Sequence, residues 1–122
     1  MTTDILNYIQ QTLSNNGINY AFMRYDGKVT YPYWVGEYDE IEVTDEDSYH
    51  EYNFRLTGTT RKSWLELEQN KQRIEELLST ATTLSNDTGV AFSYTGSLLL
   101  PTGEADLKRM QINLRIQEWR VK

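Results

Sequence analysis

The chain of 122 residues contains no cysteine, only two prolines and a single histidine. The absence of cysteine excludes disulfide frameworks, thiolate-bound zinc, iron–sulfur centres and a cysteine nucleophile. No apolar run approaches the about 20 residues that a membrane-spanning helix requires. Residues 1–13 also lack the basic start and apolar centre of a signal peptide. We therefore expect a soluble protein that needs no staple to fold and has no membrane partner.

Positive charge is missing from the middle of the chain. No Lys or Arg occurs between Lys28 and Arg55, and the 26 residues between them carry a charge of -8. The acidic residues of this stretch are Glu37, Asp39, Glu40, Glu42, Asp45, Glu46, Asp47 and Glu51. Since the whole chain carries a charge of -6, the residues outside this stretch carry +2. From Leu107 onward the chain has five basic residues and only one acidic residue, Glu118. The acidic pI of about 4.7 argues against a general binder of duplex DNA.

Two segments have the apolar spacing of amphipathic helices. Thr2 or Thr3 followed by Asp4 is an N-cap signal, and the helix that begins there is expected to stop at residues 15–17. The second helix is expected over 63–78, where Ser63 and Glu66 have the spacing of a capping box, although Thr60 could cap the helix equally well. The apolar stripes are Ile5, Leu6, Ile9 and Leu13 in the first helix, and Leu67, Ile74, Leu77, Leu78 and Ala81 in the second.

The remaining regular segments alternate between apolar and polar residues, as half-buried strands do. We expect strands at 18–23, 33–43, 50–58, 90–100 and 110–117, with Pro32 at a strand start or edge and Gly36 as a bulge. Residues 44–48 and 82–89 are expected to be loops, and 101–104 a turn.

This order predicts an α+β fold in one domain over residues 1–122. The expected architecture is a mostly antiparallel sheet of five strands with both helices packed on one face, in the order α-β-β-β-α-β-β. The chain shows no repeat, low-complexity tract or dividing linker.

Motifs that carry chemistry are absent from the sequence. His50 has no sequence neighbour that would form a catalytic set with it, and the glycines are scattered rather than gathered in a phosphate-binding loop. The acidic stretch Thr44–Ser48 lacks the ligand spacing and central glycine of a calcium loop. The sequence therefore predicts no catalytic, metal or cofactor site and favours a structural or interaction protein over an enzyme.

The layout of the whole chain supplies a further indication. A short helix is followed by the aromatic-proline strand opening Tyr31–Glu37, an acidic loop and Thr57–Thr60 leading into the long helix, and the chain closes on Gln117–Trp119. This layout resembles that of the tail terminator, or tail completion, proteins and related neck proteins of long-tailed phages and prophages.

The resemblance implies an α+β subunit that assembles, commonly as a hexamer, on the end of the finished tail tube. Such a ring stops polymerisation of the tube and forms the surface that joins the filled head. The implied partners are the chain itself, the tail tube protein and the head–tail connector proteins, while DNA passes through without specific binding. The implied location is the host cytoplasm during assembly and then the virion.

The uneven charge suggests how copies could meet, because an acidic loop and a basic strand are complementary between neighbours. We expect Asp45, Glu46 and Asp47 to be exposed at a functional surface, and Arg115 and Arg120 to be the intersubunit partners. The alternative is a monomeric acidic interaction protein, an inhibitor or nucleic-acid mimic, that uses the segment Glu37–Glu51. A small enzyme is a third possibility, and it would require a concave pocket with convergent polar groups.

Overall fold

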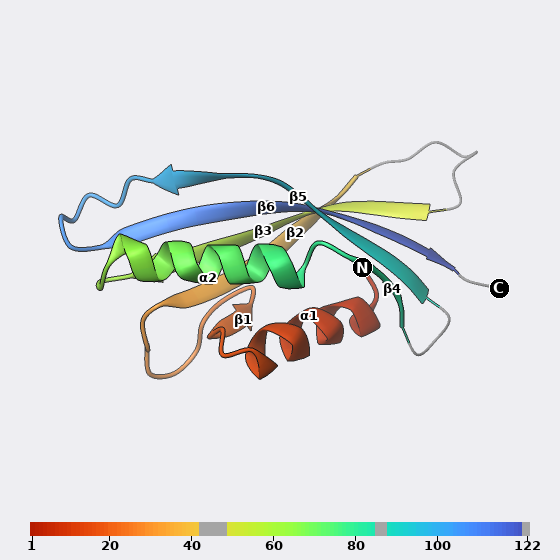
Figure 1. Cartoon of the computed structure of the whole chain (residues 1–122), viewed down its shortest axis with the longest axis horizontal. Coiled ribbons are helices and arrows are strands. Elements are labelled where there is room, and N and C mark those ends of the chain that lie inside the picture. The colour runs from red at the N-terminus through yellow and green to blue at the C-terminus, as the bar shows by residue number, and fades with distance from the viewer. Residues whose placement is uncertain (42–48, 85–87, 121–122) are drawn as a thin grey trace.

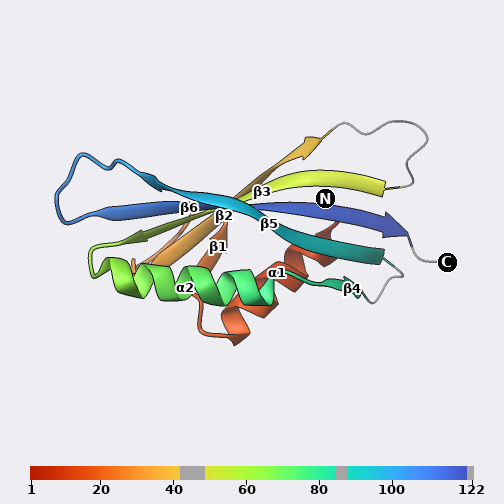
Figure 2. The same cartoon turned by 45° about the horizontal axis from the view of Figure 1, so that its top comes forward.

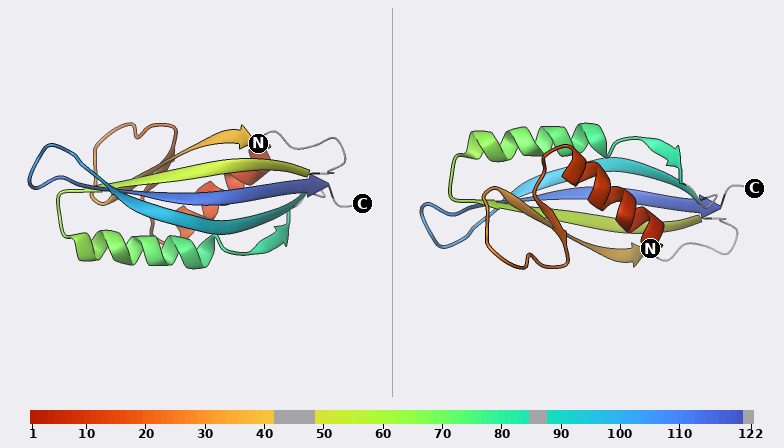
Figure 3. Two further views of the ribbon diagram at one scale, coloured as in Figure 1. Left: turned by 90° about the horizontal axis from the view of Figure 1, so that it is seen from above. Right: turned by 90° about the horizontal axis from the view of Figure 1, so that it is seen from below.

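The computed structural model describes residues 1–41, 49–84 and 88–120, and within these ranges the chain forms two helices and six strands (Figure 1). The elements are α1 (Thr3–Asn15), β1 (Tyr20–Phe22), β2 (Tyr33–Ile41), β3 (Tyr49–Thr60), α2 (Trp64–Leu77), β4 (Ala81–Thr83), β5 (Thr88–Leu100) and β6 (Lys108–Arg120). The strands form one sheet in the order β1-β2-β3-β6-β5-β4. Both helices lie on the same face of this sheet, as Figure 3 shows from above and below.

The α+β class and the two helices on one face agree with the sequence prediction, but the sheet differs from the expected one. Over the described residues it has six strands rather than five, and it is mixed, because β1 pairs with β2 in parallel. The additional strand is β4, which pairs antiparallel with β5 at Gly89–Ala91 in a segment expected to be a loop. Strand β4 has only three residues, too few to show alternation, so the sequence pattern does not reveal it, whereas β1 lies within the strand expected at 18–23.

Helix α2 is shorter than its apolar stripe suggested. Ser63 is the N-cap, and its hydroxyl accepts a hydrogen bond from the amide of Glu66 at 3.2 Å, as the capping pattern predicted. The helix ends at Leu77, with the amide of Leu78 still bonded to the carbonyl of Ile74 at 2.8 Å. Ala81 therefore belongs to β4 and not to the helical stripe.

Gly36 is a site of close packing and not the expected bulge. It pairs in regular register with Leu56, and the irregularity of the sheet falls instead between Tyr94 and Gly96. A Cβ atom at Gly36 would lie 2.6 Å from the ring of Phe54. Glycine is needed here because a buried aromatic ring occupies the space of a side chain.

The core lies between the inner face of the sheet and the two helices (Figure 2). The alternation predicted for β6 holds, since its inward residues are buried while Arg115 is exposed. The fully buried side chains include Ile5, Ile9, Leu13, Trp34, Phe54, Leu56, Leu67, Ile74 and Ile112. Each buried aliphatic side chain contributes about 1.5–3 kcal/mol to folding, so this face holds the helices, while the other face remains polar.

Candidate functional site

The outer face of the sheet, which neither helix covers, is crossed by ion pairs between neighbouring strands. Arg55 of β3 lies between two carboxylates of β2: its Nη1 is 2.6 Å from Asp39 Oδ2 and its Nε is 3.3 Å from Glu37 Oε1. The hydrogen bond from Arg55 lowers the pKa of Asp39 below its usual value. These contacts neutralise part of the acidic segment within the subunit.

A second ion pair joins the two central strands. Arg115 Nε donates to Glu51 Oε1 at 2.6 Å, and Gln117 donates to the same oxygen at 3.3 Å. Glu51 is buried, yet the hydrogen bond from Arg115 lowers its pKa, against the opposing effect of desolvation. The pair thus holds a buried carboxylate in its charged form between β3 and β6.

Of the five residues predicted to lie at an interface, the structure describes the side chain of one, Arg115. Asp45, Glu46 and Asp47 lie in 42–48, outside the described residues, and the side chain of Arg120 also lies outside them. Arg115 is half exposed and is paired with Glu51, a residue of the acidic segment of the same chain. The structure therefore brings one acidic and one basic segment together within a subunit, and the intersubunit roles stay predictions.

An uncharged strand edge is the main feature that the sequence analysis missed. None of the 13 residues of β5 is charged. Strand β4 pairs with β5 only at Gly89–Ala91, so among the described residues the outer edge of β5 has no strand partner from Ser93 to Leu100. Leu98 and Leu99 in this free stretch are 46% and 60% exposed. The apolar run 98–100 was visible in the sequence, but a run of this kind is usually buried.

The first turn of α2 adds apolar surface at the same end of the molecule. Trp64 and Leu65 are 40% and 68% exposed. Pairing of Thr60 with Lys108 sets the start of α2 beside the hairpin that joins β5 and β6, and both lie at the left in Figure 1. We call the four residues Trp64, Leu65, Leu98 and Leu99 the apolar end.

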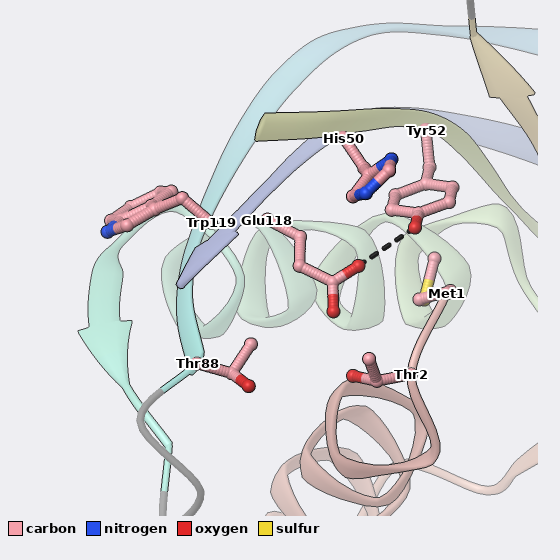
Figure 4. Close-up of a pocket in the computed structure, with 7 residues that line it drawn as sticks. All are labelled: Met1, Thr2, His50, Tyr52, Thr88, Glu118 and Trp119. Atoms are coloured by element: carbon pink, nitrogen blue, oxygen red, sulfur yellow. Dashed lines mark hydrogen bonds between the residues drawn. The ribbon is translucent and has the colours of Figure 1, made fainter. Parts of the chain in front are cut away.

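A cavity of about 430 Å³ lies at the opposite end of the sheet, beneath the start of β3 and the end of β6 (Figure 4). Its lining residues are Met1, Thr2, His50, Tyr52, Thr88, Glu118 and Trp119. Glu118 is only 6% exposed and accepts a hydrogen bond from the hydroxyl of Tyr52 at 2.8 Å. Burial, reinforced by this carboxylate, raises the pKa of Tyr52 well above its usual value.

The cavity does not contain a recognisable catalytic set. His50 Nδ1 is 3.6 Å from Glu40 Oε1, and within the described ranges His50 is not hydrogen-bonded to a serine or threonine. No group of three or more His, Asp or Glu side chains in the described part of the chain could hold a metal ion. The arrangement can bind a polar group but offers no nucleophile and base in contact.

Comparisons with known proteins do not place the chain in a family: no protein-family model matches it, and no curated protein matches it significantly. Among the described residues, no helix is both long and apolar enough to cross a membrane. Function is therefore inferred from the surfaces of the molecule itself, together with the resemblance in layout.

Proposed function

We propose that the chain is a structural subunit of the tail terminator class, which assembles with copies of itself into a ring, commonly a hexamer. The ring caps the end of a tail tube, stops its polymerisation and forms the surface that joins the head. The tube protein and the connector proteins are its partners, and DNA passes through it without specific binding. The observation that carries this proposal is the uncharged free edge of β5 beside the apolar end.

A free strand edge presents unpaired backbone groups that can pair with another chain, and monomeric proteins block such edges with charged residues, proline or bulges. The free stretch of β5 from Ser93 contains no charged residue before Pro101, although an irregularity lies at Tyr94–Gly96. Four large apolar side chains stand exposed close to it. Clustered exposed apolar residues mark interaction sites, so this end of the molecule is suited to bury surface against a second copy.

Ring closure requires that each subunit use two different surfaces. One surface is the uncharged edge of β5; the other is not the opposite edge of the sheet, where β2 beyond its contact with β1 carries Glu37, Asp39 and Glu40, which disfavour strand pairing. A contact between the β5 edge of one copy and a different surface of the next copy is head-to-tail, and association of this kind generates a ring or a filament. Within the proposal, the acidic residues Asp45, Glu46 and Asp47 face the lumen or a neighbour.

The experiment that tests the proposal is mass determination by light scattering over a wide concentration range, at low and high salt, for the wild type and the double variant Leu98→Glu/Leu99→Glu. We expect a discrete species near six subunits for the wild type and a folded monomer for the variant. Met23→Glu is the matched control, because Met23 is also 60% exposed but follows β1 at the opposite edge of the sheet. The control should assemble like the wild type.

A second arm mixes each protein with tubes assembled from the tail tube protein of the same genome, which tests whether the tube acts as the template. A wild type that stays monomeric alone and with tubes contradicts the proposal and favours the acidic interaction protein. The pairing of Glu37, Asp39 and Glu51 with arginines of the same chain already reduces the free charge that such a mimic would use.

The proposed roles of Arg115 and Arg120 are tested separately by charge reversal. Because Arg115 also holds Glu51, Arg120→Glu alone is compared with the double variant Arg115→Glu/Arg120→Glu. Salt-sensitive loss of the ring in both variants supports an electrostatic contact between copies. Unchanged assembly of both removes this contact from the proposal.

A further inference from the structure

We propose that the cavity beneath β3 and β6 is a binding site for a primary ammonium group, on a free alkylamine or on a lysine side chain. The site lies at the far end of the sheet from the apolar end, and the inference is independent of the proposed assembly. Its central element is the carboxylate of Glu118, which points from β6 into the cavity (Figure 4).

The environment of Glu118 calls for a cation. The residue is 94% buried, since only 6% of its surface is exposed, and its Oε1 atom is engaged by the neutral hydroxyl of Tyr52. Among the described side chains, no Lys or Arg forms an ion pair or hydrogen bond with it, and the amino group of Met1 donates to Tyr38 at 3.5 Å. A buried carboxylate whose described contacts include no cation is desolvated at a cost, and a bound cation would offset that cost.

The shape of the site selects an ammonium group. In Figure 4 the second oxygen of Glu118 faces the space between the hydroxyl groups of Thr2 and Thr88. An alkylammonium has three N–H donors, and in Figure 4 these three oxygens, all able to accept, point toward the same part of the cavity. The volume of about 430 Å³ leaves room for an aliphatic stem within the cavity, which Met1 and Tyr52 help to line.

Other ligand classes fit less well. A guanidinium group binds a carboxylate best through both oxygens, and Tyr52 already occupies one of them. A divalent cation requires several oxygen ligands with more than one carboxylate as a rule, and the described residues offer no such group. An anion would be repelled by Glu118.

The test is a titration of the full chain with butylammonium chloride, followed by two-dimensional ¹H–¹⁵N NMR, with butanol as the uncharged control. We expect saturable shifts confined to the amides of Thr2, Thr88, Glu118 and Trp119, and none with butanol. Glu118→Gln should weaken binding by about tenfold or more, since a charge-assisted contact is lost. The glutamine carbonyl still accepts from Tyr52, so the variant should keep its fold, which its own spectrum checks.

Glu40→Gln is the matched control variant, because it removes the same charge from an exposed carboxylate beside His50. We expect it to bind butylammonium like the wild type, and Thr88→Val to bind more weakly while retaining all carboxylates. Equal weakening in Glu118→Gln and Glu40→Gln would show general charge attraction and overturn the inference. So would the absence of saturable shifts in the wild type, which is the result expected if a side chain of the chain itself fills the cavity.

Two further ligands distinguish the sources of the ammonium group. A short peptide with one lysine that binds as tightly as butylammonium assigns the site to a lysine of a partner protein. Binding of putrescine and butylammonium with exclusion of the peptide assigns it to free amines. Either result supports the ammonium site, and neither depends on the oligomeric state, which light scattering measures independently.

Discussion

The two long edges of the sheet differ in the way they meet solvent. Along β2 the free residues after Gly36 include Glu37, Asp39 and Glu40, and β1 covers the strand before them. Along β5 the residues from Ser93 to Leu100, which have no strand partner within the described part of the chain, include no charge, and Leu98 and Leu99 among them are exposed. One sheet therefore has a protected edge and an available edge, and this asymmetry is what directional assembly requires.

The cause of the difference is desolvation. A strand that pairs with β2 would bring its backbone against carboxylates that need water, even though Arg55 neutralises part of their charge. A strand that pairs with β5 would cover serine, threonine and leucine side chains, and removing these uncharged groups from water costs less free energy than removing carboxylates. The sign of the free energy of pairing thus depends on side chains rather than on the backbone.

Removing the charges of β2 tests whether they keep that edge from pairing. In the triple variant Glu37→Thr, Asp39→Thr and Glu40→Thr, we expect the β2 edge to pair with other copies and large open assemblies to replace the proposed ring. The physical reason is that a subunit with two edges able to pair can add neighbours on both sides, and such a series of contacts does not close into a ring. Light scattering measures the change as a rise in mass beyond the ring-sized species, with no upper plateau as concentration increases.

Adding the three substitutions to the Leu98→Glu/Leu99→Glu background separates the two edges. The combined variant should form at most a dimer through β2, since β5 is then charged. Large assemblies in this background, or an unchanged ring in the triple variant alone, would show that edge charge does not govern association.

Close packing lies under the protected edge, where Gly58 of β3 lies against Trp34 of β2. A Cβ atom at Gly58 would be 2.6 Å from Trp34 Cη2, and Trp34 is fully buried. We expect Gly58→Ala to lower the free energy of unfolding by about 1–3 kcal/mol, because the indole must shift. Urea denaturation checks this. Ser93→Ala on exposed β5 is the control and should stay within about 0.5 kcal/mol of the wild type.

A Gly58→Ala protein as stable as the wild type would mean that Trp34 moves at no cost. The protection of the β2 edge would then depend only on the cover by β1 and on the charges of β2. The tight contact between β2 and β3 would not contribute to the difference between the two edges.

The smallest of these effects concerns the pair Glu51–Arg115, which joins the central strands β3 and β6. The pKa of Glu51 is lowered from its usual 4.5 by the hydrogen bond from Arg115. Stability from this pair is fully present above pH 4.5 and is lost as the pH falls through the lower, folded-state pKa. Glu51→Gln should therefore be less stable than the wild type at neutral pH, by less than Gly58→Ala, and flatter in its pH dependence below 4.5.

Urea denaturation from about pH 7 to about pH 3 measures this dependence. Glu68→Gln is a suitable control, since its carboxylate lies 3.7 Å from Lys71 on the surface of α2 and contributes little. Identical acid profiles for Glu51→Gln and the wild type would contradict the assigned role of the pair.

Strong periodic segments were predictable from the sequence. Both helices, their approximate starts and the alternation in β3 and β6 follow from where apolar residues recur. The strand β4 and the parallel direction of β1 were not predictable, since the pairing of such short strands depends on the longer strands beside them. Gly36 was misassigned because a glycine in a strand can mark either a bulge or a close approach, and only the position of Phe54 distinguishes them.

The candidate sites also include features that the sequence could have revealed and features that it could not. The uncharged run of β5 could have been noticed in the sequence, but its exposure depends on how briefly β4 covers it. Glu118 could have been found by extending the inward alternation past Ile116, which places a carboxylate among buried side chains. The contact of Glu118 with Tyr52, 66 residues away in sequence, could not have been found from the sequence.

The local sequence pattern alone determined which segments of this chain are helical or extended and which face of each segment is apolar. It also determined that acidic and basic residues are separated along the chain. These properties depend on neighbours within a few residues. Tertiary structure alone decided that Arg115 meets Glu51, that β5 keeps a free edge, and that Glu118 and Tyr52 share a cavity with the start of α1. The physical reason is that pairing and burial are set by the geometry of residues distant in sequence, which no local pattern encodes.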